Sequence, residues 1–149
     1  MEMTTEENKA IVRYWIDEVW CKNNMAAVDE FMASNFVFDW APPGVPSDIH
    51  GYKKAVTILL TAFLDLQITV DDIIAEGDKV AVRWIGDATH EGEFMGIKPT
   101  GKKVVITGVS FVHIVDGKIL EEWSEMDLLG VIQQLGMYLP TDYENRTMF

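Results

Sequence analysis

The order in which helical and strand-like patterns follow one another is the feature of this sequence that most constrains its fold. Apolar residues recur at helical spacing in three stretches of the first 64 residues. We predict three helices there, over residues 4–20, 25–33 and 51–64. Strand-like alternation and turn signals then dominate up to residue 127. Helices followed by a run of strands predict an α+β domain rather than alternating α/β units.

The strands are expected to form one curved antiparallel sheet, because turn signals separate most of them. Glu76-Gly77-Asp78 and Asp116-Gly117 are typical of hairpins, and the Gly- and Pro-containing segment 91–103 predicts a longer irregular connection. The five predicted strands cover residues 36–40, 67–75, 79–90, 103–115 and 118–127. An antiparallel meander twists strongly, so helices can cover its concave side and leave a pocket between the two layers.

Length and composition fit one domain over residues 1–149, with a core over about 6–136, a short helix at 128–135 and a tail at 137–149. The chain is 48% hydrophobic, which excludes a disordered protein. No run of ~18 apolar residues and no secretory signal pattern occur, so no membrane association is expected. The single cysteine, Cys21, excludes an internal disulfide and favours a cytoplasmic location.

The charge of the chain argues against nucleic acid as a partner. Twelve Lys and Arg residues stand against 24 Asp and Glu residues, which gives a net charge of −12. An acidic surface repels phosphate backbones and anionic membranes alike.

The strand predicted over residues 103–115 is apolar on both faces. In a single-layer antiparallel sheet one face is expected to be wet. Because the helices can cover only one face, we predict that a second copy of the chain covers the other and that the protein is a homodimer.

The last predicted strand places acids beside a tryptophan. Glu121, Trp123, Glu125 and Asp127 alternate onto one face, and Leu120, Glu122, Ser124 and Met126 onto the other. The acidic face has two interpretations. It is a solvated surface, or it aims Trp123 and Asp127 into the pocket with Glu125 facing the same cavity or its rim. A carboxylate held against aromatic surface has a raised pKa and can act as a general acid or base.

His90 is the second candidate for chemistry. It ends its strand on the face that also carries Trp84, so both side chains line the pocket if that face is concave. The alternative for a lone histidine at a strand end is a structural hydrogen bond.

Four further residues are candidate ligand contacts near the mouth of the pocket. Asp39 and Trp40 precede a Pro-Pro-Gly loop, and Tyr14 and Trp15 lie on the first helix, which must cover the sheet. Tyr14 could bond a ligand carbonyl. The alternative interpretation of Trp15 is a side chain that packs in the core and contacts no ligand. The expected ligand is a small apolar or aromatic molecule.

Motifs for metals, nucleotide cofactors and activated nucleophiles were not found in the sequence. It has no zinc-type Cys or His spacing, no phosphate-binding glycine loop and no Gly-x-Ser-x-Gly turn. By elimination, we predict acid–base chemistry with no metal and no cofactor.

Several segments resemble the SnoaL-like polyketide cyclases, also called the ester cyclase family. The resemblance covers about residues 6–136. The segments that carry it are Asn8 to Trp20, Ala75 to Trp84, Thr89 to Gly101 (Thr-His-Glu-Gly-Glu-Phe-Met-Gly-Ile-Lys-Pro-Thr-Gly), Asp116 to Asp127 and Leu128 to Gly136.

The resemblance implies a cone-shaped α+β barrel of the nuclear-transport-factor-2-like superfamily. In the characterised cyclases, a pocket aspartate is the acid–base residue of an intramolecular aldol ring closure. Asp127 matches the place of that aspartate, and His90 matches a histidine of the Thr-His-x-Gly-x-Phe segment. Many relatives have a histidine near the Pro-Pro-Gly loop, where this chain has Phe38-Asp39-Trp40.

Three functional hypotheses follow from these observations. The first is a cofactor-independent cyclase or isomerase with Asp127 as acid–base residue and His90 as polar helper. The second is an epoxide hydrolase- or dehydratase-type reaction, in which Glu125, Asp127 and His90 converge on one water. The third is a protein that binds a small molecule without catalysis.

Overall fold

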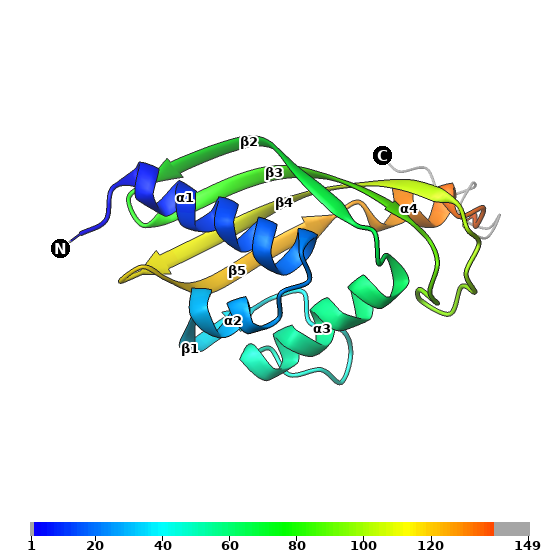
Figure 1. Ribbon diagram of the computed structural model, residues 1–149, viewed down its shortest axis with the longest axis horizontal. Helices are drawn as coiled ribbons and strands as arrows, with labels where there is room; N and C mark the ends of the chain where they lie inside the picture. Colours follow the sequence, from blue (N-terminus) through cyan, green and yellow to red (C-terminus); the bar gives the residue numbers. More distant parts are fainter. Residues whose placement is uncertain (1, 139–149) are drawn as a thin grey trace, which may run out of the picture.

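The computed structural model describes residues 2–138 and confirms an α+β fold (Figure 1). Four α-helices, one π-helical segment and five strands follow one another along this part of the chain. Their bounds are α1 (Thr5–Trp15), η1 (Ile16–Cys21), α2 (Ala26–Phe31), β1 (Met32–Phe38), α3 (Ile49–Ala62), β2 (Gln67–Glu76), β3 (Lys79–Thr89), β4 (Lys103–Val115), β5 (Lys118–Met126) and α4 (Leu128–Gln134).

The first helix begins where its sequence signal places it. The Thr4 hydroxyl accepts a hydrogen bond from the Glu7 backbone N–H at 3.1 Å, and the Glu7 carboxylate accepts one from the Thr4 N–H at 2.7 Å. This reciprocal capping box satisfies two N–H groups that a helix start leaves free. The predicted single helix over residues 4–20 changes to π-helical geometry from Ile16 to Cys21.

The five strands form one sheet in the order β1-β5-β4-β3-β2. The β2–β3, β3–β4 and β4–β5 pairs are antiparallel, as predicted. The turn signals predicted no partner for the strand at residues 36–40; as β1, it pairs with β5 in parallel. The connection from β1 to β2 contains α3 instead of a tight turn, so it leaves the direction of β1 unconstrained.

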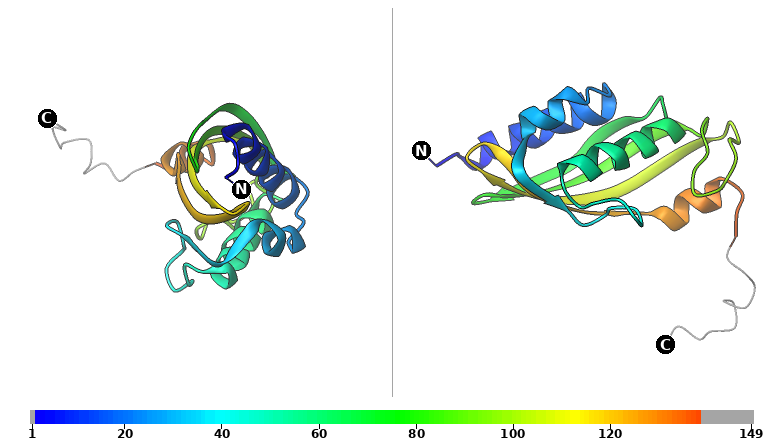
Figure 2. Two further views of the ribbon diagram at one scale, coloured as in Figure 1. Left: turned by 90° about the vertical axis from the view of Figure 1, so that its left-hand side faces the viewer. Right: turned by 90° about the horizontal axis from the view of Figure 1, so that it is seen from below.

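The sheet curls into an open arc, with α1 and α3 on its concave side (Figure 2). The core lies between these layers and is built from buried apolar side chains of every other helix and strand, with partly buried apolar side chains of β2 packed against it. Val12, Trp15 and Val56 from the helices and Val80 and Val112 from the sheet are each at most 1% exposed. Among residues 2–138, no helix has both the length and the apolar character needed to cross a bilayer.

One extra residue in β5 decides which of its side chains face the helices. The turn at Asp116-Gly117 has positive φ at both residues (50° and 75°), as a type I′ hairpin requires. Ile114 then pairs with Ile119, but His113 pairs with Glu121, so Leu120 forms a β-bulge.

The bulge reverses the facing of the rest of β5. Without it, Val112 on the inner face would oppose Glu121; with it, Val112 opposes Glu122. The inner set is therefore Glu122, Ser124 and Met126, and the outer set is Glu121, Trp123 and Glu125. A one-residue shift in register moves every following side chain to the opposite face.

Candidate functional site

Glu122 is a carboxyl group in the interior of the domain. Its side chain points to the inner face of β5, between Val112 of β4 and Phe38 of β1, and the residue is only 2% exposed. Acidic side chains are seldom fully buried unless they are paired. No basic side chain pairs with Glu122 among the described residues.

A chain of hydrogen bonds holds one oxygen of this carboxyl group. The Trp84 indole N–H donates to the Ser110 hydroxyl at 3.1 Å, Ser110 and Ser124 bond each other at 2.7 Å, and the Ser124 hydroxyl donates to Glu122 Oε1 at 2.7 Å. An indole N–H can only donate. Every donor in this series of hydrogen bonds therefore points toward the carboxylate. Because the series starts at an indole N–H, which does not accept a proton, it cannot carry a proton from Glu122 to solvent.

The other oxygen, Glu122 Oε2, is buried and has no hydrogen-bond partner. The Trp40 indole and the Tyr52 hydroxyl lie close enough to lower the pKa of Glu122, but neither bonds this oxygen with regular geometry. An unpartnered buried acceptor is uncommon and costly. Oε2 is thus the one polar atom of the carboxyl group that is free to contact a ligand.

Burial sets the protonation behaviour of this group. Removal of the carboxyl group from water raises the pKa of Glu122 from 4.5 to about 7. The hydrogen bond from Ser124 lowers the pKa, but its effect is smaller than that of burial. The negative charge of nearby Asp39 adds to the increase. A carboxyl group with a pKa near neutrality can both accept and return a proton.

Tyr52 supplies a hydroxyl group beside the carboxyl group. It is fully buried on α3, and its oxygen accepts a hydrogen bond from the Trp15 indole at 3.1 Å. Burial, followed by the charge of Glu122, raises the pKa of Tyr52 well above 10. The hydroxyl group therefore keeps its proton and remains a donor.

Aromatic rings enclose the two groups. The Trp40 ring lies 5.9 Å from Trp20, 4.9 Å from Phe38 and 5.6 Å from Tyr52, measured between centroids. Trp40 is half-buried, and its indole N–H has no partner. Together the rings form an apolar wall that keeps water away from Glu122.

Gly108 explains how Trp84 reaches the serine chain. It pairs with Trp84 across β3 and β4. A Cβ atom at residue 108 would lie 2.3 Å from the Trp84 ring and 2.7 Å from the Glu125 carbonyl oxygen. The indole thus occupies the space that a side chain on this strand would fill.

The structure places the outer face of β5 and the residue that follows it in solvent. Asp127 is exposed and caps α4, where its carboxylate accepts a hydrogen bond from the Gly130 N–H at 2.9 Å. Glu125 is exposed and Trp123 is 61% exposed. Of the two interpretations, the structure agrees with the solvated surface: the bulge at Leu120 turns Trp123 and Glu125 outward, and Asp127 lies beyond the end of the strand as the cap of α4.

His90 is buried, as expected for an inward-facing residue, but it lies away from Glu122. Its backbone bonds Lys102, just before β4, whereas Glu122 pairs with Val112 near the far end of that strand. The Thr100 N–H donates to His90 Nδ1 at 3.2 Å, so we infer that the neutral ring has its proton on Nε2. That Nε2 atom is buried without a partner.

The remaining predicted contacts divide between the interior and the surface. Trp15 and Trp84 bond within the interior, and Trp40 lies in the aromatic wall. Asp39 is exposed and its carboxylate accepts a hydrogen bond from the Ser124 N–H at 3.0 Å, so it anchors the strand that carries Glu122. Tyr14 is 64% exposed and does not point inward, contrary to the prediction.

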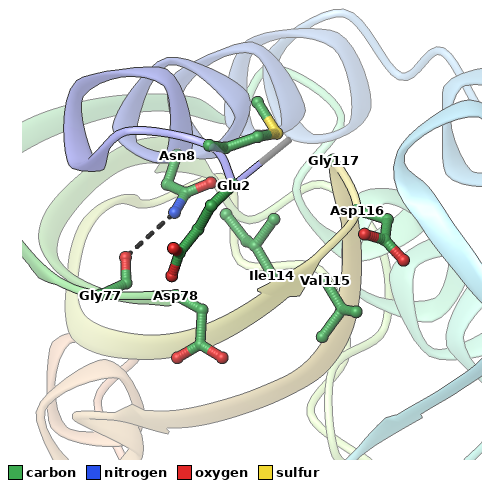
Figure 3. Close-up of a pocket in the computed structure, with 9 residues that line it drawn as sticks. Glu2, Asn8, Gly77, Asp78, Ile114, Val115, Asp116 and Gly117 are labelled. Carbon is green, nitrogen blue, oxygen red and sulfur yellow. Dashed lines mark hydrogen bonds between the residues drawn. The ribbon is translucent and has the colours of Figure 1, made fainter.

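Two clefts stand out among residues 2–138, and both lie on the surface. The first, of about 180 Å³, lies where the N-terminal segment meets two hairpin turns (Figure 3); its lining includes Asn8, Asp78, Ile114 and Asp116. The second, of about 460 Å³, is shallow and lies between α1 and β2. Neither is lined by Glu122, whose carboxyl group is enclosed by the surrounding side chains.

Metal ligands do not gather in this part of the chain. Within the described range, no three His, Cys, Asp or Glu side chains are placed so that they could hold a metal ion. Glu125, Asp127 and His90 do not converge either, since the first two are exposed and the third is buried at the other end of the sheet. The arrangement proposed for a water-adding enzyme is therefore not formed.

A curved sheet wrapped over helices, with a titratable carboxyl group inside, is an α+β domain of the nuclear-transport-factor-2-like class. The chain belongs to the SnoaL-like polyketide cyclase family, whose sequence model matches residues 10–135. No functionally curated protein matches the chain.

Solved structures support this assignment. A candidate polyketide cyclase from Acidithiobacillus ferrooxidans is 30% identical, with a TM-score of 0.78, covering 91% of this chain and 98% of its own. AclR, a candidate hydroxylase from Streptomyces galilaeus, is 31% identical, with a TM-score of 0.80 and coverages of 97% and 96%. IdmH, a candidate polyketide cyclase from Streptomyces antibioticus, is 30% identical, with a TM-score of 0.75 and coverages of 87% and 99%.

Sequence reasoning missed Glu122, Tyr52 and the serine pair. A signal for them was present: Ser110 is polar among apolar residues on the face of β4 that carries Val112. A polar residue on an apolar strand face marks a buried hydrogen-bond network.

Proposed function

We propose that the protein is a cofactor-independent acid–base enzyme in which Glu122, not Asp127, exchanges a proton with the substrate. The observation that carries the proposal is the state of the Glu122 carboxyl group. It is buried, its Oε1 is fixed by Ser124, and its Oε2 has no partner. A dry, oriented carboxylate with one free oxygen is suited to remove a proton from carbon.

The reaction that fits this group and the family is an intramolecular aldol-type ring closure of a polyketide ester. Glu122 removes the proton from the activated carbon, and the electron pair of the C–H bond forms an enolate. The enolate carbon then attacks a carbonyl carbon of the same molecule, and a new C–C bond closes the ring. The alkoxide formed at that carbonyl takes the proton back from Glu122, so the enzyme is regenerated without a cofactor.

Tyr52 is the group best placed to stabilise the enolate. Its oxygen accepts a hydrogen bond from Trp15, so its own O–H remains to donate, either to Glu122 beside it or to a bound enolate. Because its pKa is raised well above 10, it donates a hydrogen bond without losing the proton. A donor in a dry site stabilises a developing oxyanion more than the same donor in water does.

Substrate access requires movement of Trp40. This ring covers Glu122 together with Trp20 and Phe38, and it lies at the start of the connection from β1 to α3. It is half-buried and its indole N–H bonds no other group. Rotation of the ring would give up only the irregular contact of its N–H with Glu122 that lowers the pKa of that group, and it would uncover Oε2. An apolar or aromatic substrate would replace its contacts.

The roles predicted for Asp127 and His90 stay predictions that the same experiment tests. Asp127 serves α4 as a cap, and His90 lies beside Phe63 with ring centroids 5.8 Å apart. Neither contacts the Glu122 network through a hydrogen bond in residues 2–138.

The test uses a substrate that needs only a base. The ring opening of 5-nitrobenzisoxazole starts with removal of one acidic C–H proton and reports a buried carboxylate directly. We expect the wild-type protein to accelerate it and Glu122→Gln to lose ~10²–10⁴-fold of that rate. Asp127→Asn is the matched control and should keep the wild-type rate.

Two results would reject the assignment. If Glu122→Gln keeps the rate while Asp127→Asn loses it, the aspartate is the base. If neither variant changes the rate of a protein that circular dichroism shows to be folded, the site is not catalytic and a non-catalytic binding protein is the better description.

A further inference from the structure

The π-helical segment η1 interrupts the regular winding of the first helix. From Ile16 to Cys21 the backbone follows the wider π-helical pattern, and the Lys22 N–H donates to the Asp17 carbonyl, five residues earlier, at 2.9 Å. Segments of this kind are rare and occur frequently at functional sites. This one carries Trp20, whose ring lies against the aromatic wall around Glu122. The segment therefore bears directly on the candidate site.

The π-helical winding decides which side chain follows Trp15 on the inner side of the helix. In a regular α-helix that residue would be Val19, because one turn takes about 3.6 residues. A π-helix joins residue i to residue i+5, so Trp20 comes round toward the side of Trp15. Trp20 is only 9% exposed. The change in winding thus directs two indole rings, rather than one, toward Tyr52 of α3.

Both indoles approach the hydroxyl group of Tyr52. The Trp15 N–H donates to the hydroxyl oxygen at 3.1 Å. The Trp20 ring stands at 90° to the Tyr52 ring, with centroids 6.5 Å apart. Its N–H makes a less regular contact with the same oxygen, close enough to lower the pKa of Tyr52 against the larger effect of burial. Because an indole N–H can only donate, the hydroxyl oxygen is the acceptor in both contacts.

Two donors on one hydroxyl oxygen restrict the direction of its proton. A phenolic oxygen has lone pairs that accept and a single proton that it donates. When both indoles occupy the lone pairs, the O–H must point away from the first helix, to the side where the charge of Glu122 acts on Tyr52. A donor that is oriented before the substrate arrives needs no reorganisation when negative charge develops beside it.

We propose that Trp20 is a positioning residue, which the π-helical segment places so that it fixes the direction of the Tyr52 O–H together with Trp15. This inference rests on the proposed function, because the aligned O–H is the group that stabilises the enolate formed by Glu122. Trp20 acts through Tyr52 and does not need to touch the substrate. The segment that departs from α-helical winding is thereby part of the site.

Packing is the other role that the contacts of Trp20 allow. Its ring lies 5.9 Å from Trp40 and 6.5 Å from Tyr52, measured between centroids, and a large apolar side chain without an N–H could fill the same space. The two roles use different parts of the residue, since packing needs the ring and positioning needs the N–H. A replacement that keeps the ring and removes only the N–H therefore separates them.

The first test observes the Tyr52 hydroxyl group and does not depend on catalysis. Nuclear magnetic resonance of protein labelled with ¹³C at the tyrosine Cζ responds to hydrogen bonds at the phenolic oxygen, and Tyr52→Phe identifies the signal of Tyr52. Replacement of Trp20 by β-(3-benzothienyl)alanine puts sulfur in place of the N–H in a ring of similar size. We expect the Tyr52 signal to shift. The same replacement of Trp123, which is 61% exposed, is the matched control and should leave this signal unchanged.

The second test measures the ring opening of two benzisoxazoles. Cleavage of the N–O bond leaves negative charge on the oxygen, which is where an aligned Tyr52 O–H would donate. Loss of the Trp20 N–H should lower kcat about tenfold, the size of one hydrogen bond, and leave KM unchanged. The loss should be larger for unsubstituted benzisoxazole than for 5-nitrobenzisoxazole, because the nitro group withdraws charge from that oxygen. Trp20→Phe also lacks the N–H and should show the same difference between substrates.

Two results would overturn the inference. One is a Tyr52 signal that keeps its wild-type position when the N–H at residue 20 is absent. The other is a rise in KM with kcat unchanged, or an equal loss of kcat for both substrates, since either assigns Trp20 to packing. The proposed function fails by a different result, a wild-type rate in Glu122→Gln, and the Tyr52 signal still decides the role of Trp20 in that case. Circular dichroism of each variant excludes unfolding as the cause.

Discussion

Each of the two faces of β4 and β5 departs at a few positions from the usual distribution of polarity. The inner face holds Ser110, Glu122 and Ser124 in the dry interior, whereas the outer face exposes Phe111 and Trp123. Folding alone would favour apolar side chains inside and polar ones outside. Departures from that rule tend to mark functional surfaces, so the inner face is the candidate for chemistry and the outer face for association.

A single residue separates these two assignments. The bulge at Leu120 decides whether Glu121 or Glu122 faces the helices. The same β5 sequence with a regular hairpin register would bury Trp123 and expose Ser124. Three properties can therefore be tested by substitution. Burial of Glu122 should cost free energy of folding when the carboxyl group is ionised, Trp84 should hold the serine hydrogen bonds in place, and Asp127 should cap α4.

The largest expected effect on stability concerns the pH dependence of folding. The pKa of Glu122 is about 7 in the folded state and 4.5 in the reference state, so the folded protein binds more protons between these values. Stability must then fall as pH rises from about 4.5 through 7, by about 3 kcal/mol for a shift of this size. Glu122→Gln should remove this loss.

The measurement is urea unfolding of both proteins at acidic and at alkaline pH. Groups such as Asp65 and Asp78, whose pKa values are lowered by hydrogen bonds from Thr89 and His113, titrate in both proteins and cancel in the difference. Glu122→Gln should be the more stable protein above neutral pH. Equal stability of the two proteins across the range would contradict a buried, titrating Glu122.

The next effect concerns the packing that supports the serine chain. Gly108→Ala would place a methyl group 2.3 Å from the Trp84 ring, and overpacking of this kind costs about 1–3 kcal/mol. The ring must move, and its N–H would then leave Ser110. Urea unfolding and the near-ultraviolet signal of tryptophan report both changes. Thr107→Ala, an exposed neighbour on β4, is the control.

The smallest effect concerns Asp127. Asp127→Ala removes the cap of α4 and should cost about 0.5–2 kcal/mol, whereas Asp127→Asn keeps an acceptor for the Gly130 N–H and should cost less. Neither change should alter proton transfer. A large loss of the base-catalysed rate in Asp127→Asn, with the fold intact, would place the chemistry on the outer face.

Much of the fold could be predicted from local patterns. The span of β4 and the start of β2 agree with the alternation in the sequence, and the type I′ turn follows from Asp116-Gly117. The parallel pairing of β1 with β5 could not be predicted, because it joins segments far apart in the chain and no turn signal specifies it.

The site was harder to predict for a related reason. The alternation correctly divided β5 into two sets, but it does not say which set faces inward. That choice depends on the bulge at Leu120, which no local propensity in the sequence marks. His90 illustrates the same limit, since its burial was expected from its face while its separation from the last strand depends on the register of β4.

The most direct test of the central claim is to observe the Glu122 carboxyl group itself. Isotope-edited infrared difference spectra of protein labelled with ¹³C-glutamate, recorded as a function of pH and compared with Glu122→Gln, isolate its protonated and ionised bands. We expect one glutamate band that titrates near 7 and is missing from the spectra of Glu122→Gln. A Glu122 band that titrates near 4.5, the value of a solvated side chain, would contradict a dry acid–base site on the inner face.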